Sequence, residues 1–275
     1  MVISRRAGSV PGWSYFVGSA VFHYLGPAFA VLLFAHIAPA GVAGLRIWSA
    51  ALVFAIWRRP WRRLGEPAIA IWGLVLAAMN TCFYEAVARL PLGTVAAIEF
   101  VPVIALAAAG ARTPRNAVAL VAAVGGVYVL TDVRLAGEPL GFVFAFANAV
   151  LFGLYIVLAH RVAQGDGVDG LAAAMLVAAV CVIPLGTWHA APALTSPALL
   201  GAGIGVGVSS SVIPYVCDQL AMARMARATY ALLVSLLPAT ATVIGAMVLG
   251  QLPMPAEVAG IGLVVAGTAL HRERG

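Results

Sequence analysis

The sequence predicts an all-α integral membrane protein with ten transmembrane helices, arranged as two inverted five-helix repeats. The first observation is composition, because 63% of the residues are hydrophobic and only 9% are charged. Soluble domains carry about 25% charged residues, so 275 residues with so little charge cannot cover a surface that faces water. The second observation is that the apolar residues form runs of about 20, joined by short loops rich in Pro and Gly, which is the length of a membrane-spanning helix.

Ten apolar stretches satisfy this length rule, and no segment remains for a soluble domain. The first stretch follows Arg5 and Arg6 but is longer than a signal-peptide core of about 7 to 15 residues, so we expect it to be a retained helix. The predicted spans are 14–36, 39–57, 67–88, 91–111, 115–132, 138–160, 169–188, 197–222, 228–249 and 255–271.

The arginines predict the orientation of these spans in the membrane. With the N-terminus inside, thirteen arginines face the cytoplasm and two, Arg89 and Arg134, face outside. This imbalance agrees with the positive-inside rule and places both termini in the cytoplasm. The inside group is Arg5, Arg6, Arg58, Arg59, Arg62, Arg63, Arg112, Arg115, Arg161, Arg224, Arg227, Arg272 and Arg274.

An even number of spans allows the chain to divide into halves of five, 1–134 and 135–275, within one membrane domain. Because five is odd, the second half inserts upside down relative to the first. The segments 88–97 (ARLPLGTVAA) and 223–232 (ARMARATYAL) share Ala, Arg, Thr and Ala at matching places. Inverted repeats of this kind build the central sites of many transporters.

Several classes of protein are excluded or disfavoured. The chain contains no HExxH, GxSxG, P-loop or strand-associated GxGxxG motif, so we predict that it is not an enzyme. Its cysteines and histidines show no metal-ligand spacing, and we expect no metal and no cofactor. The net charge of +6 comes from arginines in short loops rather than on one face, which argues against a nucleic-acid partner. The expected partners are the lipid bilayer, a small molecule and protons.

Polar side chains inside the spans occur in short stripes at helical spacing. Asn80 and Tyr84 share one face of the third span, and Asn148 and Tyr155 share one face of the sixth. A third stripe in the eighth span is made by Ser211, Tyr215 and Asp218. Such faces suit a small polar solute held by hydrogen bonds and ring stacking. Asp218 lies nearer the inner end, where it is either a cavity residue or a solvated helix end.

Glu99 is the most informative of the buried residues, because it lies about two turns into its span. A charged side chain at the centre of a membrane helix costs about 2.5 to 3.5 kcal/mol. The carboxyl must therefore be neutral, paired or facing a wet cavity, and a carboxyl that takes up and releases a proton could couple solute movement to the proton gradient. His23 is either a hydrogen-bonded core histidine or a second proton-handling group.

Two further charges and a set of glycines have structural interpretations. Glu85 lies near the outer interface, solvated or paired with Arg89 four residues on. Arg46 could neutralise a buried carboxylate or extend its charge to the interface, and we favour a structural ion pair. Gly201, Gly203, Gly205 and Gly207 give two overlapping small-xxx-small faces, which predict close helix packing rather than a ligand site.

Two runs carry a resemblance to a known family. They are residues 41–54 (GVAGLRIWSAALVF) and 90–100 (LPLGTVAAIEF), the second preceded by Met79, Asn80, Phe83 and Tyr84 in an MN..FY pattern. With the ten-span count, and with SVIPY at 211–215, the chain resembles the drug/metabolite transporter superfamily, EamA type, and looks most like the inner-membrane threonine and homoserine exporters. It departs from the family at Gln251, where Glu is common, and at Pro102, which comes one residue early.

This resemblance implies a bacterial inner-membrane, multi-pass exporter that works by alternating access with proton antiport. The leading substrate class is amino acids such as threonine or homoserine. Within transport, a drug or nucleoside permease of the same fold is the alternative. A non-transporting membrane scaffold is the alternative from another class, and it predicts that the polar stripes pair with each other and leave no cavity. The residues expected to line the cavity are Asn80, Tyr84, Glu99, Asn148, Tyr155, Tyr215 and Asp218, with Glu99 and His23 coupled to protons.

Overall fold

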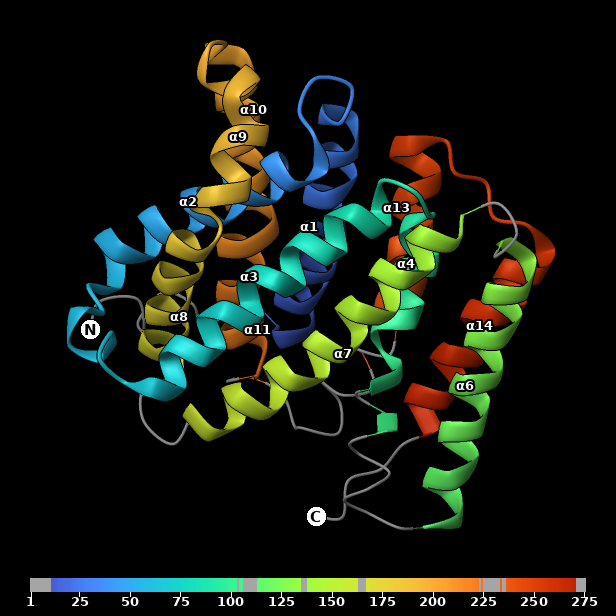
Figure 1. Ribbon diagram of the computed structural model, residues 1–275. Coiled ribbons are helices and arrows are strands. Elements are labelled where there is room, and N and C mark those ends of the chain that lie inside the picture. The colour runs from blue at the N-terminus through green and yellow to red at the C-terminus, as the bar shows by residue number, and fades with distance from the viewer. Residues whose placement is uncertain are drawn as a thin grey trace.

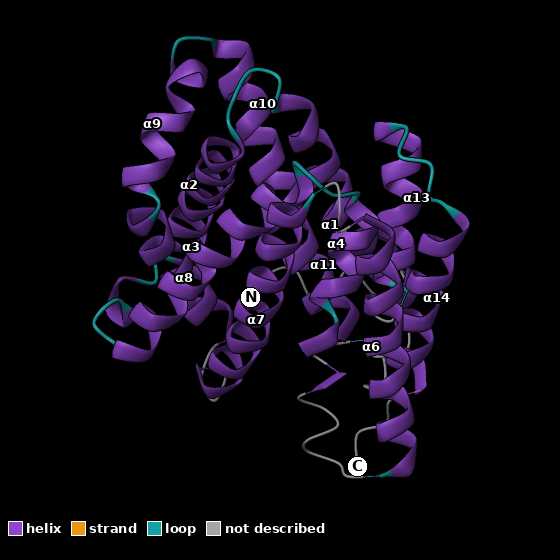
Figure 2. Ribbon diagram, turned by 45° about the vertical axis from the view of Figure 1, so that its right-hand side comes forward, coloured by secondary structure: helices purple, strands orange, loops and turns teal. Residues whose placement is uncertain are grey.

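The computed structural model describes residues 11–102, 104–105, 113–134, 138–162, 167–222, 224, 233 and 236–270, and these ranges form helices joined by short loops (Figure 2). In the first half of the chain the elements are α1 (Gly12–Leu33), α2 (Pro39–Arg58), the 3-10 turn η2 (Trp61–Arg63), α3 (Pro67–Val87), α4 (Leu92–Glu99) and α6 (Pro114–Arg134). In the second half they are α7 (Pro139–Val162), α8 (Gly167–Cys181), α9 (Ile183–Leu194), α10 (Pro197–Gly207), the π-helical turn η3 (Val208–Val212), α11 (Ile213–Met222), α13 (Leu237–Leu249) and α14 (Pro255–Leu270).

Proline sets the start of most of these helices. Pro39, Pro67 and Pro197 occupy the first helical turn of α2, α3 and α10, where the missing N–H costs nothing and the fixed φ suits the helix. Residues in the left-handed conformation end two of them, Arg59 after α2 and Gly250 after α13. These signals explain why the predicted spans 39–57, 67–88 and 255–271 agree with α2, α3 and α14 within one residue at each end.

Five helical segments are long and apolar enough to cross a membrane, namely α1, α2, α3, α7 and the continuous run Pro197–Asp218. A sixth candidate is the pair α8 and α9, and three shorter apolar helices are Pro114–Leu130, α13 and α14. The predicted spans 91–111 and 228–249 lie partly outside the described residues. The count of ten spans therefore remains a prediction, whereas the described residues agree with an all-α membrane protein of several spans.

The predicted seventh span, 169–188, is wrong as a single straight helix. The chain bends by 76° between α8 and α9, around Val182. Pro184 has no N–H to continue the hydrogen-bond ladder across this corner. The carbonyl oxygen of Ala179, whose donor in a straight helix would be the Ile183 N–H, accepts a hydrogen bond of 2.9 Å from the indole Nε1 of Trp48 on α2. A side chain of another helix thus satisfies the backbone at the bend.

Most major packing interfaces join the two halves of the chain. Helix α6 lies against α14 at one edge, and α3 lies against α7 and α8 (Figure 1). Helix α1 packs on α11 and α13, α2 packs on α8, α9 and α10, and α4 packs on α7 and α13. The two halves are therefore interleaved, and the core belongs to both.

Large apolar side chains cover much of the outer surface. Ile56, Val121, Trp188 and Met247 are each more than two thirds exposed, at 68%, 72%, 82% and 80%. Exposed apolar side chains in such number are unfavourable in water and indicate contact with lipid.

Of the two small-xxx-small faces predicted in the eighth span, only the one formed by Gly203 and Gly207 packs closely against another helix. A Cβ at Gly203 would lie 2.7 Å from Leu45 of α2, and a Cβ at Gly207 would overlap Ser49 Oγ. Gly201 and Gly205 have nothing within 4 Å of such a Cβ. Close helix packing is confirmed for Gly203 and Gly207, which let α10 approach α2.

Candidate functional site

Glu99 and Asn148 form a buried contact between the two halves of the chain. Every residue of α4 is buried, and Glu99, at its end, is 7% exposed. Asn148 of α7 is fully buried, and its Nδ2 donates a hydrogen bond of 3.1 Å to Glu99 Oε1. The amide oxygen of Asn148 has no partner among the described residues. The pair therefore leaves hydrogen-bonding capacity unused in a low-dielectric environment.

Arg46 lies in the middle of α2, about 10 Å along the helix from Pro39 and about 18 Å from Arg58. Its Nε donates to Ser211 Oγ at 3.0 Å and its Nη2 to the Ser210 carbonyl at 3.3 Å. The guanidinium carbon also lies 5.6 Å from the centre of the Tyr84 ring. These partners are neutral, so the ion pair that the sequence favoured is not formed with any carboxylate of the described residues.

The π-helical turn η3 supplies both serines that bond Arg46. Such turns widen the helix and are frequent at functional sites. Ser210 Oγ donates back to the Val206 carbonyl at 2.6 Å, while the Ser210 carbonyl is left to accept from Arg46. A Cβ at Gly26 of α1 would overlap Ser210 Oγ, so α1 and α2 hold η3 closely from two sides.

A series of ring contacts leads from Phe100, next to Glu99, to a second set of polar residues, Tyr155, Tyr215 and Asp218. Phe100 lies 6.5 Å from Phe152, which stacks on Tyr155 at 6.1 Å with the planes 6° apart. The hydroxyl groups of Tyr155 and Tyr215 are hydrogen-bonded to each other, and the charge of Asp218 acts on both. Tyr155 follows Asn148 by seven residues, which is about 10 Å along α7. The stripes on α7 and α11 therefore meet at these two tyrosines.

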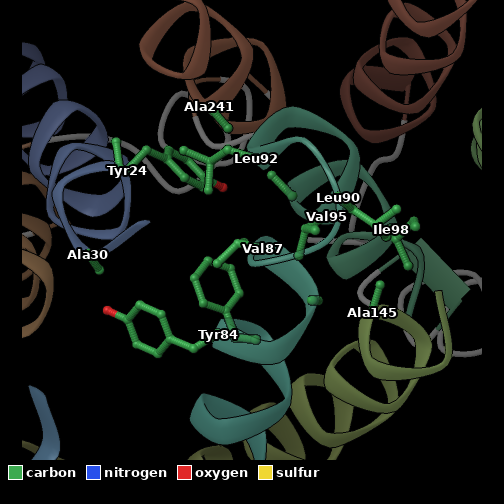
Figure 3. Close-up of a cluster of buried hydrophobic side chains, with 14 of the residues drawn as sticks. Tyr24, Ala30, Tyr84, Val87, Leu90, Leu92, Val95, Ile98, Ala145 and Ala241 are labelled. Carbon is green, nitrogen blue, oxygen red and sulfur yellow. The ribbon is translucent and has the colours of Figure 1, made fainter. Parts of the chain in front are cut away.

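Two buried tyrosines lie next to these groups. Figure 3 shows Tyr24 of α1 and Tyr84 of α3 in one core with Leu92, Val95 and Ile98 of α4. Tyr24 is 1% exposed and Tyr84 is fully buried, and neither hydroxyl has a partner within the described part of the chain. A buried hydroxyl without a partner is costly, so both are available to a bound solute or water.

The remaining candidates have mainly local partners. Asn80 Nδ2 donates to the Leu76 carbonyl of its own helix at 2.9 Å, so its amide is used within α3. His23 is half-buried, packs edge-on against Tyr24 at 5.2 Å, and lies within electrostatic range of Arg46. Glu85 and Arg89 form the expected ion pair, 2.6 Å long.

A cavity of about 400 Å³ lies at the end of the molecule where α4 begins, between that helix and the α13–α14 connection. Thr94, Thr242, Gln251 and Glu257 contribute polar atoms to its wall. Thr94 precedes Glu99 by five residues, about 7 Å along α4. Gln251 Oε1 accepts a hydrogen bond of 3.1 Å from the Leu92 N–H and so caps α4. This contact needs only a side-chain oxygen, so Gln can make it without the charge of the Glu that is common at this position.

The sequence analysis did not predict that Arg46 bonds the serines of η3, nor that the Tyr24 hydroxyl is buried without a partner among the described residues. Arg46 was visible as an intramembrane charge, but its serine partners lie about 165 positions away in the chain, and spacing cannot reveal such a contact. Tyr24 carried no signal beyond its position next to His23.

A multi-pass helical membrane protein with polar side chains of both halves gathered in its interior has the architecture of a solute transporter. Residues 139–272 match the EamA-like transporter family. The chain is 29% identical over 254 residues to the threonine/homoserine exporter RhtA of Escherichia coli K12, covering 88% of this chain and 85% of that protein. The RhtA of Salmonella typhimurium LT2 matches with the same identity and coverage.

A solved crystal structure of another protein has the same fold, with a TM-score of 0.61 over 95% of this chain and 96% of that chain, at 18% identity. The second half of the chain therefore matches the EamA-like transporter family, and most of the chain is similar to the threonine/homoserine exporters.

Proposed function

We propose that the protein exports small amino acids, such as threonine or homoserine, across the bacterial inner membrane by alternating access with proton antiport. The observation that carries the proposal is the buried Glu99 carboxyl, bonded across the two halves by Asn148. A carboxyl inside a membrane protein that has hydrogen-bonding capacity beside it can change its protonation when the path to water changes. The similarity to the RhtA exporters supports the substrate class.

The proposed architecture is two inverted repeats, residues 1–134 and 135–275. The helix contacts support it, because exchanging each helix with its counterpart five spans away reproduces most of the major contacts. The contact of α3 with α7 then corresponds to that of α11 with α1, and the contact of α4 with α7 to that of α13 with α1. Pairs related in this way allow the two mouths of a central path to open in turn.

The proposed orientation places both termini in the cytoplasm, so that the cavity at the start of α4 faces outside. Glu99 lies deeper along the same helix. A solute released from the interior would reach this cavity past Thr94, whose buried hydroxyl has no partner among the described residues. The cavity is therefore proposed as the outer mouth.

The test is counterflow in proteoliposomes that contain threonine, with labelled threonine outside and with or without a pH step. The wild type is expected to exchange threonine and homoserine and to accumulate label when the pH step is applied. Glu99→Gln keeps the size and the hydrogen-bonding shape but cannot ionise, and we expect it to lose the response to the pH step. Glu85→Gln is the matched control, because Glu85 is paired with Arg89 near the interface, and it should respond like the wild type.

Equal pH responses for Glu99→Gln and wild type would overturn proton coupling through Glu99. No exchange of any amino acid by the wild type would overturn the substrate class. The aromatic series of Phe100, Phe152 and Tyr155 favours the second candidate, a permease for flat ring compounds such as nucleosides or drugs. In that case nucleosides or aromatic drugs, rather than amino acids, would compete for exchange.

A further inference from the structure

The arrangement around Arg46 is unusual for a charge inside a membrane. An ionised side chain at this depth is expensive unless an opposite charge or a wet cavity compensates it. Three ion pairs between described residues, Arg58 with Asp169, Arg63 with Glu66 and Arg89 with Glu85, lie at helix ends. Arg46 is in the middle of α2, and residues 39–57 around it in the sequence include no Asp or Glu.

The serine contacts use only part of the guanidinium. Arginine has five N–H donors, and two of them are used by Ser211 Oγ and the Ser210 carbonyl. Arg46 itself is only partly buried, so the remaining donors border space that is not filled by its helix neighbours. The face of the Tyr84 ring, 5.6 Å away, limits the directions in which the group can turn.

The environment holds Arg46 in place without neutralising it. Ser49, three residues on, bonds the carbonyls of Leu45 and Arg46 and is covered by Gly207. The η3 turn, held by Gly26 on the other side, presents Ser210 and Ser211 to the guanidinium. A fixed cation with free donors recognises carboxylates by paired hydrogen bonds.

We propose that Arg46 binds the carboxylate of the exported solute, and that the ammonium group of the same solute lies toward Glu99. This rests on the proposed function and narrows it to zwitterionic α-amino acids. The charges of Arg46 and Glu99 are close enough to act on each other, yet they do not form an ion pair. A zwitterion placed between them supplies each with its missing counter-charge, and the Tyr84 and Tyr24 hydroxyls can take its polar side chain.

The test compares solutes that differ in one group, as competitors of labelled threonine in counterflow. Threonine carries both charges, threoninol replaces the carboxylate with an alcohol, and 3-hydroxybutyrate lacks the ammonium group. For the wild type, threoninol should compete at least about tenfold more weakly than threonine, because it lacks the charge-assisted bonds to Arg46. 3-Hydroxybutyrate should also be weak, through the loss of its partner at Glu99.

The variants are Arg46→Gln, Arg46→Lys and the control Arg63→Gln, which removes the same charge from a partly exposed pair in the loop between α2 and α3. Direct binding to purified protein in nanodiscs provides the readout if exchange is slow. Arg46→Gln should lose at least about tenfold in threonine affinity and nothing in threoninol affinity, which abolishes the preference. Arg46→Lys should keep part of the preference because it keeps the charge, and Arg63→Gln should match the wild type.

Each outcome bears on the proposal. Equal losses for threonine and threoninol in Arg46→Gln, or no preference in the wild type, would show that Arg46 acts only in packing and would overturn it. A wild type that binds and exchanges no amino acid would overturn the proposed function and this inference together. Monodisperse elution of each variant confirms that the folded protein is being measured.

Discussion

The contact between Gly207 and α2 gives a prediction whose magnitude follows from the structure. A Cβ at this position would lie 2.7 Å from the Arg46 carbonyl oxygen and would overlap Ser49 Oγ. Real Cβ atoms do not approach that closely, so α10 and α2 must separate in Gly207→Ala. Overpacking of this kind costs about 1 to 3 kcal/mol.

Gly205→Ala is the matched control, two residues away on the same helix, with nothing within 4 Å of the new Cβ. Both variants gain helix propensity of roughly 0.5 to 1 kcal/mol, so this gain cancels in their difference. Gly207→Ala should therefore be less stable than Gly205→Ala by about 1 to 3 kcal/mol. Because η3 follows directly and bonds Arg46, exchange activity should also fall in Gly207→Ala and not in the control.

The assay is the temperature at which each purified variant loses its monodisperse elution peak, measured together with threonine counterflow. Ser49→Ala combined with Gly207→Ala should recover only part of the stability, because the Arg46 carbonyl still blocks the new methyl group. If Gly207→Ala were as stable and as active as Gly205→Ala, the close packing of α10 on α2 would be refuted.

Two further predictions concern other parts of the molecule. Gly126→Ala should destabilise the α6–α14 contact, because its Cβ would lie 2.5 Å from the Gly260 carbonyl oxygen. The control Gly125→Ala meets nothing within 4 Å and should be neutral or stabilising. The thermal stability of the two purified variants, compared with the wild type, tests this prediction. The hydrogen bonds from Arg63 hold the pKa of Glu66 below its ordinary value of 4.5. The pair's small contribution is thus complete above that value and is lost as the pH falls through the lowered pKa, so Glu66→Gln and wild type should converge in thermal stability at acidic pH and differ slightly at neutral pH.

Local signals in the sequence predicted much of the helix layout. Pro39 and Pro67 mark helix starts, and the boundaries drawn from them hold within one residue. The bend at Val182 was not predicted, because apolar length alone cannot distinguish a straight span from a corner. The donor that stabilises the corner, Trp48, comes from a different helix and cannot be found from the local sequence.

The candidate site was predictable only where the relevant contacts follow helical spacing. Tyr155 on α7 was identified from its own helix, and its meeting with Tyr215 follows from two stripes facing the interior. The bond from Asn148 to Glu99 and those from Arg46 to η3 join residues far apart in the chain, which spacing does not encode. The π-helical turn also has no sequence signature here beyond three consecutive serines, 209–211.

The Trp48 indole has a consequence for how the protein can move. Straightening the α8–α9 corner would pair the Ala179 oxygen with the Ile183 N–H and leave the Trp48 indole N–H without a partner in a lipid environment. Gly44 and Gly186, which approach closely beside the same ring, leave little room for α2 to slide past α9. These three helices therefore form a rigid block that draws on both halves of the chain. Rearrangements that admit or release a solute are expected elsewhere, where α1 meets α11 and α4 meets α13.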